Sequence, residues 1–251
     1  MENTHTKTRI VIVGSKGRMG EALLRLARAN PALELAGGVD KGDNVIDMID
    51  RADVLIEFAH HALTPLLVQT AVEHRKALVI GTTGHTDEER AAIEGQSQKI
   101  PIVFAPNYSV GVNLLFHLTK IAAQTLGDEF DREVVEMHHR HKLDAPSGTA
   151  RRLAEILAQA ADTTYDASVI HGRHGDVGAR PKKIIGMHAL RGGDVVGDHT
   201  VMFAADGERL ELTHKASSRD TFAAGALRAA QWVADKKPGL YSMQDVLGLG
   251  V

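Results

Sequence analysis

The sequence predicts an α/β protein in which a parallel sheet covered on both faces precedes a separate α+β domain. Residues 9–105 alternate near-continuous apolar strands with helices, a pattern typical of parallel sheets that are buried on both faces. A glycine-rich turn, Gly14 to Gly20, separates the first strand from the first helix. Residues 182–215 then read as long strands, and the Asp206-Gly207 pair between two of them is a strong hairpin signal.

The first half of the chain supplies the repeated strand-helix units. Arg9–Val13 is a β-branched run, and the helix after it, Glu21–Ala29, turns its leucines inward before Asn30-Pro31 ends it. The next elements are strand Leu33–Val39, strand Ala52–Phe58, helix Pro65–Arg75, strand Ala77–Ile80, helix Asp87–Gln98 and strand Ile102–Ala105. Units repeated in this way predict that the strands run parallel in one sheet.

The pattern changes after Asn107. We expect helix Asn113–Leu126, strand Arg132–His139, helix Thr149–Ala161, consecutive antiparallel strands Lys182–Ala189, Val195–Ala205 and Arg209–His214, helix Thr221–Asp235 and a short helix Gln244–Leu249. The final helices are predicted to return to the first domain. The predicted domains are therefore residues 1–108 with 219–251, and residues 109–218.

Composition narrows the class of protein. The 251 residues are 43% hydrophobic and 24% charged, as in an ordinary globular protein, and the net charge of −3 predicts neither nucleic acid nor a membrane as partner. There is no cysteine, which excludes disulfides and thiol chemistry. The polar start and the absence of a long apolar run argue against a signal peptide or a membrane span, so we expect a cytoplasmic protein.

The glycine-rich turn predicts a dinucleotide site. Gly14, Gly17 and Gly20 let the backbone approach a pyrophosphate at the start of a helix, although their spacing is not that of the commonest fingerprint. Asp40, at the end of the second strand, suits the ribose hydroxyls of NADH, and Lys41 suits the 2′-phosphate of NADPH. A plain turn at either place is the alternative. Gly81-Thr82-Thr83 and Ala105-Pro106-Asn107-Tyr108 follow later strands and could hold the nicotinamide end.

A cationic cluster, His138-His139-Arg140-His141-Lys142, predicts the substrate site. If the strand continues through it, His138, Arg140 and Lys142 share one face, and His138 and Lys142 can share a proton network. Ser147 is a good N-cap, so Gly148 and Thr149 can offer N–H groups to an anion. A small substrate with two carboxylates fits this array. The alternatives are a solvated charged strand end or a metal site, but no Asp-Glu set completes the latter and we expect no metal.

These motifs carry a resemblance to a known family. The run from Glu136 to Ala150, with Gly17-Arg18-Met19-Gly20, Gly81-Thr82-Thr83-Gly84, the segment Asn107 to Asn113, Arg173 to Arg180 and His214 to Arg219, resembles the dihydrodipicolinate reductases, also called 4-hydroxy-tetrahydrodipicolinate reductases, of bacterial lysine and diaminopimelate biosynthesis. The resemblance covers nearly the whole chain. Two features depart from the family: the segment after Lys41 is short, and Lys16 stands where a small residue is usual, where it would reach a phosphate or point to solvent.

The resemblance implies a fold and an activity. The fold is a Rossmann-like dinucleotide-binding domain plus an α+β substrate-binding and oligomerisation domain with an open mixed sheet, assembled as a homotetramer. The activity is NADH- or NADPH-dependent reduction of (hydroxy-)dihydrodipicolinate, a cyclic imine dicarboxylate, to tetrahydrodipicolinate by hydride transfer to C4.

The resemblance also implies the site residues. His138 and Lys142 would handle protons, and His139, Gly148 and Thr149 would bind the substrate. The cofactor would be held by Gly14, Ser15, Lys16, Gly17, Arg18, Met19, Asp40, Lys41, Gly81, Thr82, Thr83, Ala105, Pro106, Asn107 and Tyr108. Two other functions stay open: a non-catalytic NADP-sensing protein, and another small-substrate NAD(P) dehydrogenase.

Overall fold

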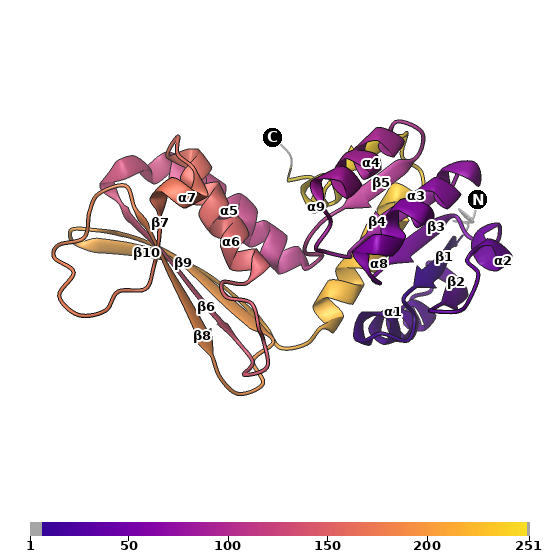
Figure 1. The fold of residues 1–251 in the computed structure, drawn as a ribbon, viewed down its shortest axis with the longest axis horizontal. Helices are drawn as coiled ribbons and strands as arrows, with labels where there is room; N and C mark the ends of the chain where they lie inside the picture. The colour runs from indigo at the N-terminus through magenta and orange to yellow at the C-terminus, as the bar shows by residue number, and fades with distance from the viewer. Residues whose placement is uncertain (1–6, 250–251) are drawn as a thin grey trace, which may run out of the picture. The chain divides into compact units, whose positions relative to one another are not determined.

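The protein has two compact units, each built on its own sheet. The computed structural model describes residues 7–249, so the ends of the predicted first domain, 1–6 and 250–251, lie outside the described residues. One unit comprises the described residues up to Val110 together with those from Arg219 on, and the other is Gly111–Ser218. The first contains a parallel sheet of six strands and the second a mixed sheet of five, which confirms the predicted fold class (Figure 1).

The sheet of the first unit has the order β11-β5-β4-β3-β1-β2, and every pair of neighbours is parallel. Its strands are β1 (Thr8–Val13), β2 (Leu33–Val39), β3 (Val54–Glu57), β4 (Ala77–Ile80), β5 (Pro101–Phe104) and β11 (Gly239–Tyr241). The order reverses beside β1, which has β2 on one side and β3 on the other. Open α/β sheets bind ligands beyond the carboxyl ends of the strands at such a reversal.

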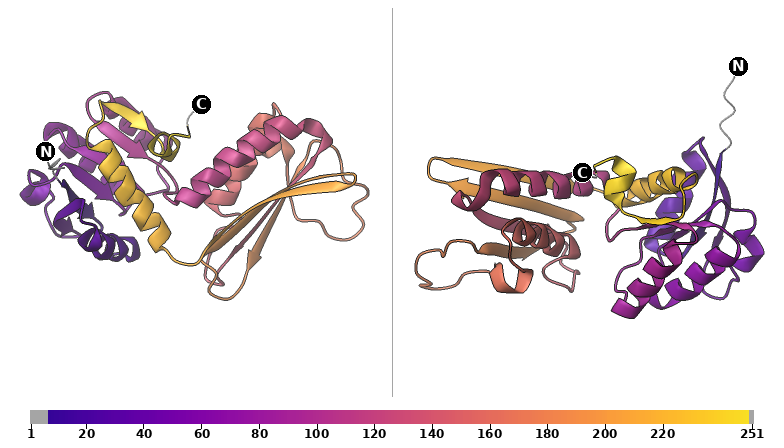
Figure 2. Two further views of the ribbon diagram at one scale, coloured as in Figure 1. Left: turned by 180° about the vertical axis from the view of Figure 1, so that it is seen from behind. Right: turned by 90° about the horizontal axis from the view of Figure 1, so that it is seen from above.

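Helices cover both faces of this sheet (Figures 1 and 2). Alternate residues of β1 face different cores: Ile10 and Ile12 pack with residues of α1 (Arg18–Ala29), α8 (Asp220–Val233) and α9 (Met243–Leu247). Val11 and Val13 pack instead with residues of α2 (Ile46–Ile49), α3 (Thr64–Glu73) and α4 (Asp87–Ser97). The short η1 (His61–Leu63) leads into α3. This two-sided burial explains why the strands are almost continuously apolar.

The sheet of the second unit corrects one prediction. Its order is β10-β9-β6-β8-β7, with β6 (Asp131–His138), β7 (Val169–His171), β8 (Ile185–Arg191), β9 (Gly197–Ala205) and β10 (Glu208–Ala216). β9 and β10 form the predicted antiparallel hairpin, and Gly207 has φ +87 in its turn. The expectation of three consecutive antiparallel strands is wrong for β8, because β6 lies between β8 and β9 and pairs parallel with β8.

Helices pack on one face of this second sheet. α5 (Val110–Leu126) and α6 (Gly148–Ala160) bury their apolar sides against strand residues such as Val134, Met187 and Phe203. The short elements η2 (Gly127–Glu129) and α7 (Tyr165–Ser168) follow α5 and α6. Along β6, Val134, Glu136 and His138 are buried, whereas Glu133, Val135 and Met137 are only half-buried. The predicted alternation of this strand is therefore confirmed as far as His138.

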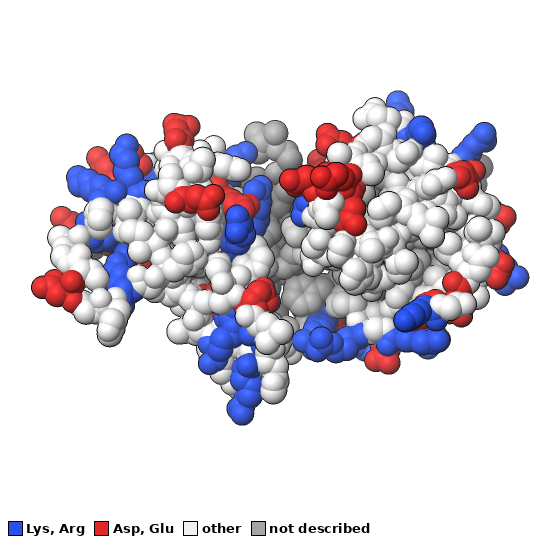
Figure 3. Space-filling model, viewed as in Figure 1, with Lys and Arg blue, Asp and Glu red and all other residues white. Residues whose placement is uncertain are grey.

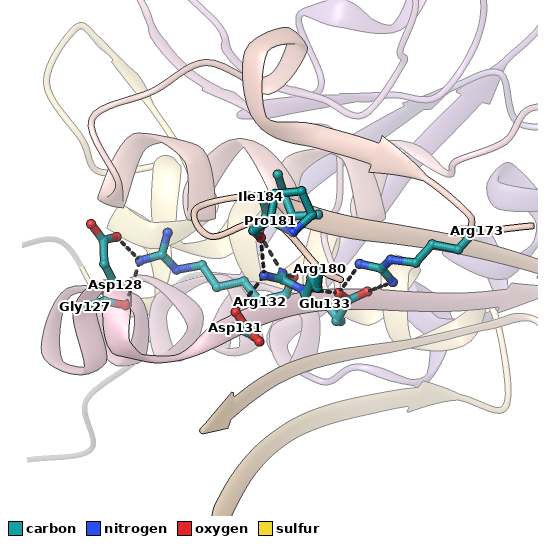
Figure 4. Close-up of polar contacts among 9 residues, drawn as sticks. All are labelled: Gly127, Asp128, Asp131, Arg132, Glu133, Arg173, Arg180, Pro181 and Ile184. Atoms are coloured by element: carbon teal, nitrogen blue, oxygen red, sulfur yellow. Dashed lines mark hydrogen bonds and ion pairs between the residues drawn. The ribbon is translucent and has the colours of Figure 1, made fainter. Parts of the chain in front are cut away.

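An ion-pair cluster fastens a long loop to the opposite face of β6. Arg173 and Arg180 both point at the Glu133 carboxylate, from 2.7 and 2.9 Å (Figure 4). His188 Nε2 lies 2.8 Å from the same carboxylate. Although burial opposes ionisation, these three partners lower the pKa of Glu133 to about 2. These ion pairs hold the loop in place. The strand after the loop begins later than predicted, because Lys183, which was expected in a strand, lies in a turn with φ 64.

The surface carries both signs of charge. On the face drawn in Figure 3, basic and acidic side chains are interspersed over both units. Within residues 7–249, no helix is both long and apolar enough to cross a membrane.

The apolar core of the first unit makes a stability prediction on one helix. Leu67 of α3 is 5% exposed and its neighbour Leu66 is 65% exposed. Leu67→Ala should lower the free energy of unfolding by roughly 2–5 kcal/mol, because it leaves a cavity. Leu66→Ala should change it by less than about 0.5 kcal/mol. Urea unfolding followed by the fluorescence of Trp232, the single tryptophan of the sequence and part of the same unit, measures both. Equal losses would contradict the packing described.

Candidate functional site

The turn after β1 brings main chain against main chain. A Cβ at Gly14 would lie 2.4 Å from the carbonyl oxygen of Phe58, and a Cβ at Gly20 would lie 2.2 Å from the carbonyl oxygen of Gly14. Gly14 also has φ +83, which favours glycine. Helix α1 begins after Gly17, and no side chain caps it. The first N–H groups of α1 can therefore bind an anion, as a dinucleotide pyrophosphate requires.

Asp40 ties this turn to the end of β2. Its carboxylate accepts hydrogen bonds from the backbone N–H groups of Lys16 (2.7 Å) and Lys41 (2.8 Å). These two bonds lower the pKa of Asp40, so the group is an anion at neutral pH. The side chains of Lys16 and Lys41 are exposed. The arrangement fits a nucleotide, because a fixed carboxylate lies where ribose hydroxyls would need an acceptor.

Two adjoining cavities surround the turn. One, of about 730 Å³, is lined by Gly14, Gly17, Asp40, Lys41 and apolar residues that include Leu66 and Leu67. The other, of about 620 Å³, is lined by Gly17, Arg18, Met19, Gly81, Thr82, Thr83, Phe58, Ala59, His60 and His61. Gly17, Phe58, Ala59 and His60 line both cavities. The structure thus brings together predicted residues from the ends of β1, β2 and β4 around two cavities that share part of their lining.

Other predicted cofactor residues have structural contacts. Ser15 is 7% exposed, with its Cβ against Gly38. Tyr108 is 1% exposed, and its hydroxyl donates to the carbonyl oxygens of Ile80 and Val103. Burial raises the pKa of Tyr108. The segment Ala105–Tyr108 follows β5 but does not line either cavity among the described residues. Because their side chains are buried, Ser15 and Tyr108 are suited to contact a cofactor through their backbone atoms and not through their side chains.

A buried carboxyl group, Glu57 at the end of β3, supports the second cavity. It accepts hydrogen bonds from the Thr82 hydroxyl and from the backbone N–H of Ala59. Burial raises the pKa of Glu57. The same Thr82 hydroxyl accepts a hydrogen bond from the Ala59 N–H at 2.9 Å. Glu57 thus joins the loops after β3 and β4.

The second unit holds a polar network around the buried Glu136. This side chain is fully buried, and His138 Nδ1 lies 2.6 Å from its Oε2. Arg191 contacts both carboxylate oxygens, at 2.9 and 3.0 Å, and the backbone N–H of Ser147 donates to Oε1 at 3.1 Å. Burial opposes the ionised form, but these donors outweigh it and lower the pKa of Glu136 to about 2. The carboxylate is therefore an anion at any physiological pH.

The predicted reason for pairing His138 with Lys142 is wrong. β6 ends at His138 because the chain turns there, and the backbone N–H of Lys142 donates to the carbonyl oxygen of His139 at 3.1 Å. Arg140 and Lys142 therefore do not continue one face of a strand. Lys142 instead pairs with Asp144 at 2.9 Å. The charges of His138 and Lys142 nevertheless both act to lower the pKa of His199.

His199 of β9 is a buried histidine that the sequence did not reveal. Its Nε2 lies 3.1 Å from the Ser147 hydroxyl, and its ring centroid lies 5.1 Å from that of His138. Burial, followed by the charge on His138, lowers the pKa of His199 to about 3. The side chain is therefore neutral at pH 7. Only the strand pairing, which sets His199 opposite both Glu136 and His214, could have identified it.

The start of α6 adds the anion-binding element. Ser147 is the N-cap, as predicted, and its hydroxyl accepts a hydrogen bond from the Ala150 N–H at 3.2 Å. Gly148 is exposed, and apart from its chain neighbours and the backbone of its own helix, no described atom lies within 4 Å of where its Cβ would be. Thr149 and His139 are half-buried. Together with the side chains of His138, Lys142 and Arg191, the first turn of α6 makes a site suited to a carboxylate-bearing molecule. Across residues 7–249, no group of three or more possible metal ligands is found.

Comparisons with known proteins identify relatives over nearly the whole chain. Residues 8–108 match the family model described as "Dihydrodipicolinate reductase, N-terminus", and residues 111–247 match the one described as "Dihydrodipicolinate reductase, C-terminus". The 4-hydroxy-tetrahydrodipicolinate reductase of Akkermansia muciniphila is 60% identical over 240 residues, covering 96% of this chain and 98% of the relative. That of Hahella chejuensis is 47% identical, covering 96% and 99%.

Solved structures agree on the fold. The dipicolinate-bound dihydrodipicolinate reductase from Paenisporosarcina sp. TG-14 superposes with a TM-score of 0.79 at 23% identity, covering 96% of this chain and 99% of that one. The diaminopimelate (DAP) dehydrogenase of C. glutamicum in complex with DAP has a TM-score of 0.56 at 14% identity, covering 95% and 93%.

The neutral state of His199 predicts a pH dependence of stability. Its pKa is lowered from 6.5 to about 3 by folding, so the unfolded chain takes up the proton first and stability is lost as the pH falls through this window. Between pH 6.5 and 4.5 this single group should cost about 2 kcal/mol. His199→Gln, which can still bond Ser147, should lose about 2 kcal/mol less than wild type over that interval. Urea unfolding at the two pH values, followed by circular dichroism, measures the difference; parallel losses would contradict a buried neutral histidine.

Proposed function

The chain belongs to the dihydrodipicolinate reductase family, and on that basis we propose that it catalyses the NAD(P)H-dependent reduction of (hydroxy-)dihydrodipicolinate to tetrahydrodipicolinate. The observation that carries the proposal is the network of the second unit. His138, a candidate proton donor, and Ser147, the N-cap directly before Gly148 and Thr149, are held by the same carboxylate of Glu136. One site thus combines a proton source with a helix start that suits a carboxylate.

We propose that the first unit holds the nicotinamide cofactor. The pyrophosphate would lie on the first N–H groups of α1 beside Gly14 to Met19, where any side chain at Gly14 or Gly20 would collide with backbone. Asp40 and Lys41 would meet the adenosine ribose. Gly81 to Thr83, together with the backbone of Ala105 to Tyr108, would hold the nicotinamide end. When bound, the reduced nicotinamide supplies the hydride that adds to ring carbon C4 of the substrate.

We propose that the second unit binds the substrate and supplies the proton. His139 and the N–H groups of Gly148 and Thr149 would hold its carboxylates. As hydride adds to C4, negative charge spreads along the C=C–C=N unit of the substrate, and a proton from the pair His138 and Lys142 neutralises it. These cations stabilise the charge of the transition state more than they stabilise the uncharged ring of the ground state.

A coupled assay tests the function. The substrate is generated in the assay mixture by the synthase that condenses pyruvate with aspartate semialdehyde. The loss of NADH or NADPH absorbance is then followed with each nucleotide separately. Rapid oxidation is expected, and the ratio of the two rates measures how Asp40 and Lys41 divide the preference. A folded, nucleotide-binding protein that oxidises neither would contradict the proposal. It would favour the NADP sensor or another dehydrogenase.

Replacing the proton donors should lower turnover. His138→Ala and Lys142→Ala should each reduce kcat by about 10²–10⁴-fold, since a missing proton donor typically costs that much. The affinity for the nucleotide should stay near that of wild type. Leu143→Ala is the matched control, because Leu143 lies in the same loop and is 99% exposed. Full kcat in either donor variant would remove that residue from the mechanism.

We also propose that the open face of the second sheet forms a homotetramer. This face carries Val135, Met137 and Met202, all half-buried in the single chain, and Leu190, which is 50% exposed. Apolar side chains gathered on one face are typical of an interface between subunits. Light scattering should report four times the 27.0 kDa of one chain. Leu190→Glu should lower that mass, and a wild-type protein with the mass of a single chain would overturn this assembly.

A further inference from the structure

The Glu136 carboxylate uses all of its acceptor capacity inside the site. Oε2 accepts from His138 Nδ1 (2.6 Å) and from one Arg191 nitrogen (2.9 Å), and Oε1 accepts from the other Arg191 nitrogen (3.0 Å) and from the Ser147 N–H (3.1 Å). A carboxylate offers about four acceptor positions, so none is left over. A fully buried anion satisfied in this way has one fixed geometry.

We propose that Glu136 is a positioning residue that sets both the proton-donating nitrogen of His138 and the place of the carboxylate-binding start of α6; this inference rests on the proposed function. An ionised carboxylate can only accept hydrogen bonds, so His138 must carry its hydrogen on Nδ1. The nitrogen that exchanges a proton with the substrate is then Nε2. A Cβ at position 197 would lie 2.9 Å from Nε2, so Gly197 leaves that nitrogen the room it needs.

The same ion pair fixes the loop between β6 and α6. Arg191, at the end of β8, also donates to the carbonyl oxygen of Asp144 at 2.6 Å. The chain from His138 to Ser147 is therefore attached at three points. Glu136 binds its two ends, the ring of His138 and the N–H group of Ser147, and Arg191 binds the carbonyl oxygen of Asp144 between them. Any movement of Glu136 shifts His138 and the N–H groups of Gly148 and Thr149 together. Glu136 thereby sets the spacing between the proton donor and the carboxylate site.

The charges around His138 come from several elements. β6 contributes Glu136 and β9 contributes His199, which both contact His138, and β8 contributes Arg191, which pairs with Glu136. Around His199 lie also His214 of β10 and Lys142 of the loop before α6; Asp198 acts on His214, and Asp144 pairs with Lys142. Of the acidic groups, Glu136 is the one in hydrogen-bond contact with the His138 ring. Its negative charge lies 2.6 Å from Nδ1 of the proposed proton donor. Removing that charge should therefore change proton exchange as well as stability.

The experiment compares two carboxylates of one strand. Glu136→Gln keeps the shape but removes the charge. Glu133→Gln does the same three residues away, on a carboxylate whose pKa is also about 2 but which holds Arg173, Arg180 and His188 on the other face. Histidine labelled with ¹³C and ¹⁵N gives an NMR titration curve for His138, assigned by its absence in His138→Gln. The coupled assay gives kcat, KM and the pH profile of kcat/KM.

Glu136→Gln should move the titration midpoint of the His138 signal to lower pH by about one unit or more, and the alkaline limb of kcat/KM should move with it. We expect kcat to fall about 10-fold or more, with KM for the nucleotide unchanged. Glu133→Gln should change neither the titration midpoint of His138 nor the alkaline limb of kcat/KM. Unchanged midpoint and limb in Glu136→Gln would reduce Glu136 to a structural role and overturn the inference, while the reductase function would stand.

Two measurements keep the outcomes separate. If wild type shows no reductase activity, the proposed function fails, and the NMR midpoints still decide whether Glu136 controls His138. If Glu136→Gln does not fold, the wild-type spectrum decides instead. Above its titration, the His138 ring must show the hydrogen on Nδ1; a ring with the hydrogen on Nε2 would overturn the inference.

Discussion

The ionised carboxylates of strand β6, one buried and one half-buried, are the constraint on which the second unit depends. A buried charge is very costly unless it is paired and hydrogen-bonded, so each carboxylate must gather donors from distant parts of the chain. Glu136, on the face toward the helices, gathers β8 and the start of α6, and Glu133, on the opposite face, gathers a long loop through Arg173 and Arg180 (Figure 4). Because strand side chains alternate, one strand organises both faces of its sheet. The site residues are thus placed by electrostatics as well as by apolar packing.

The first unit depends on a different constraint, because the backbone of the turn after β1 must be free of side chains. Gly14 and Gly20 let backbone carbonyl groups approach to distances that no Cβ would permit, and Gly17 leaves the start of α1 uncapped. Asp40 then uses its carboxylate to hold the backbone of Lys16 and Lys41. The proposed phosphate-binding turn owes its shape to close backbone contacts, whereas the proposed substrate site owes its shape to a charged network. The two parts of one proposed reaction therefore depend on different physical terms.

What the sequence could predict follows from the range of each interaction. Helices, strands, the hairpin at Asp206-Gly207 and the N-cap at Ser147 rest on local patterns, and the structure confirms them. The pairing of β6 with β8, the short strand β11 and the places of Arg191 and His199 rest on register between strands far apart in the chain, which no local pattern encodes. Lys142 shows the intermediate case. Its membership of the site was predicted, but the alternation used to place it fails, because the chain turns after His138.

The contrast between His138 and His199 supports His138, and not His199, as the proposed proton donor. Their rings lie 5.1 Å apart, but His138 touches the Glu136 carboxylate, whereas His199 touches the Ser147 hydroxyl. Burial and the nearby cations keep His199 neutral, with its pKa lowered to about 3, so near neutral pH it can orient Ser147 but has no charge to give up as an acid. Neighbouring titratable groups whose surroundings separate their protonation states are how proteins assign acid and base roles. In this site burial makes His199 neutral, whereas the ring of His138 contacts the Glu136 carboxylate.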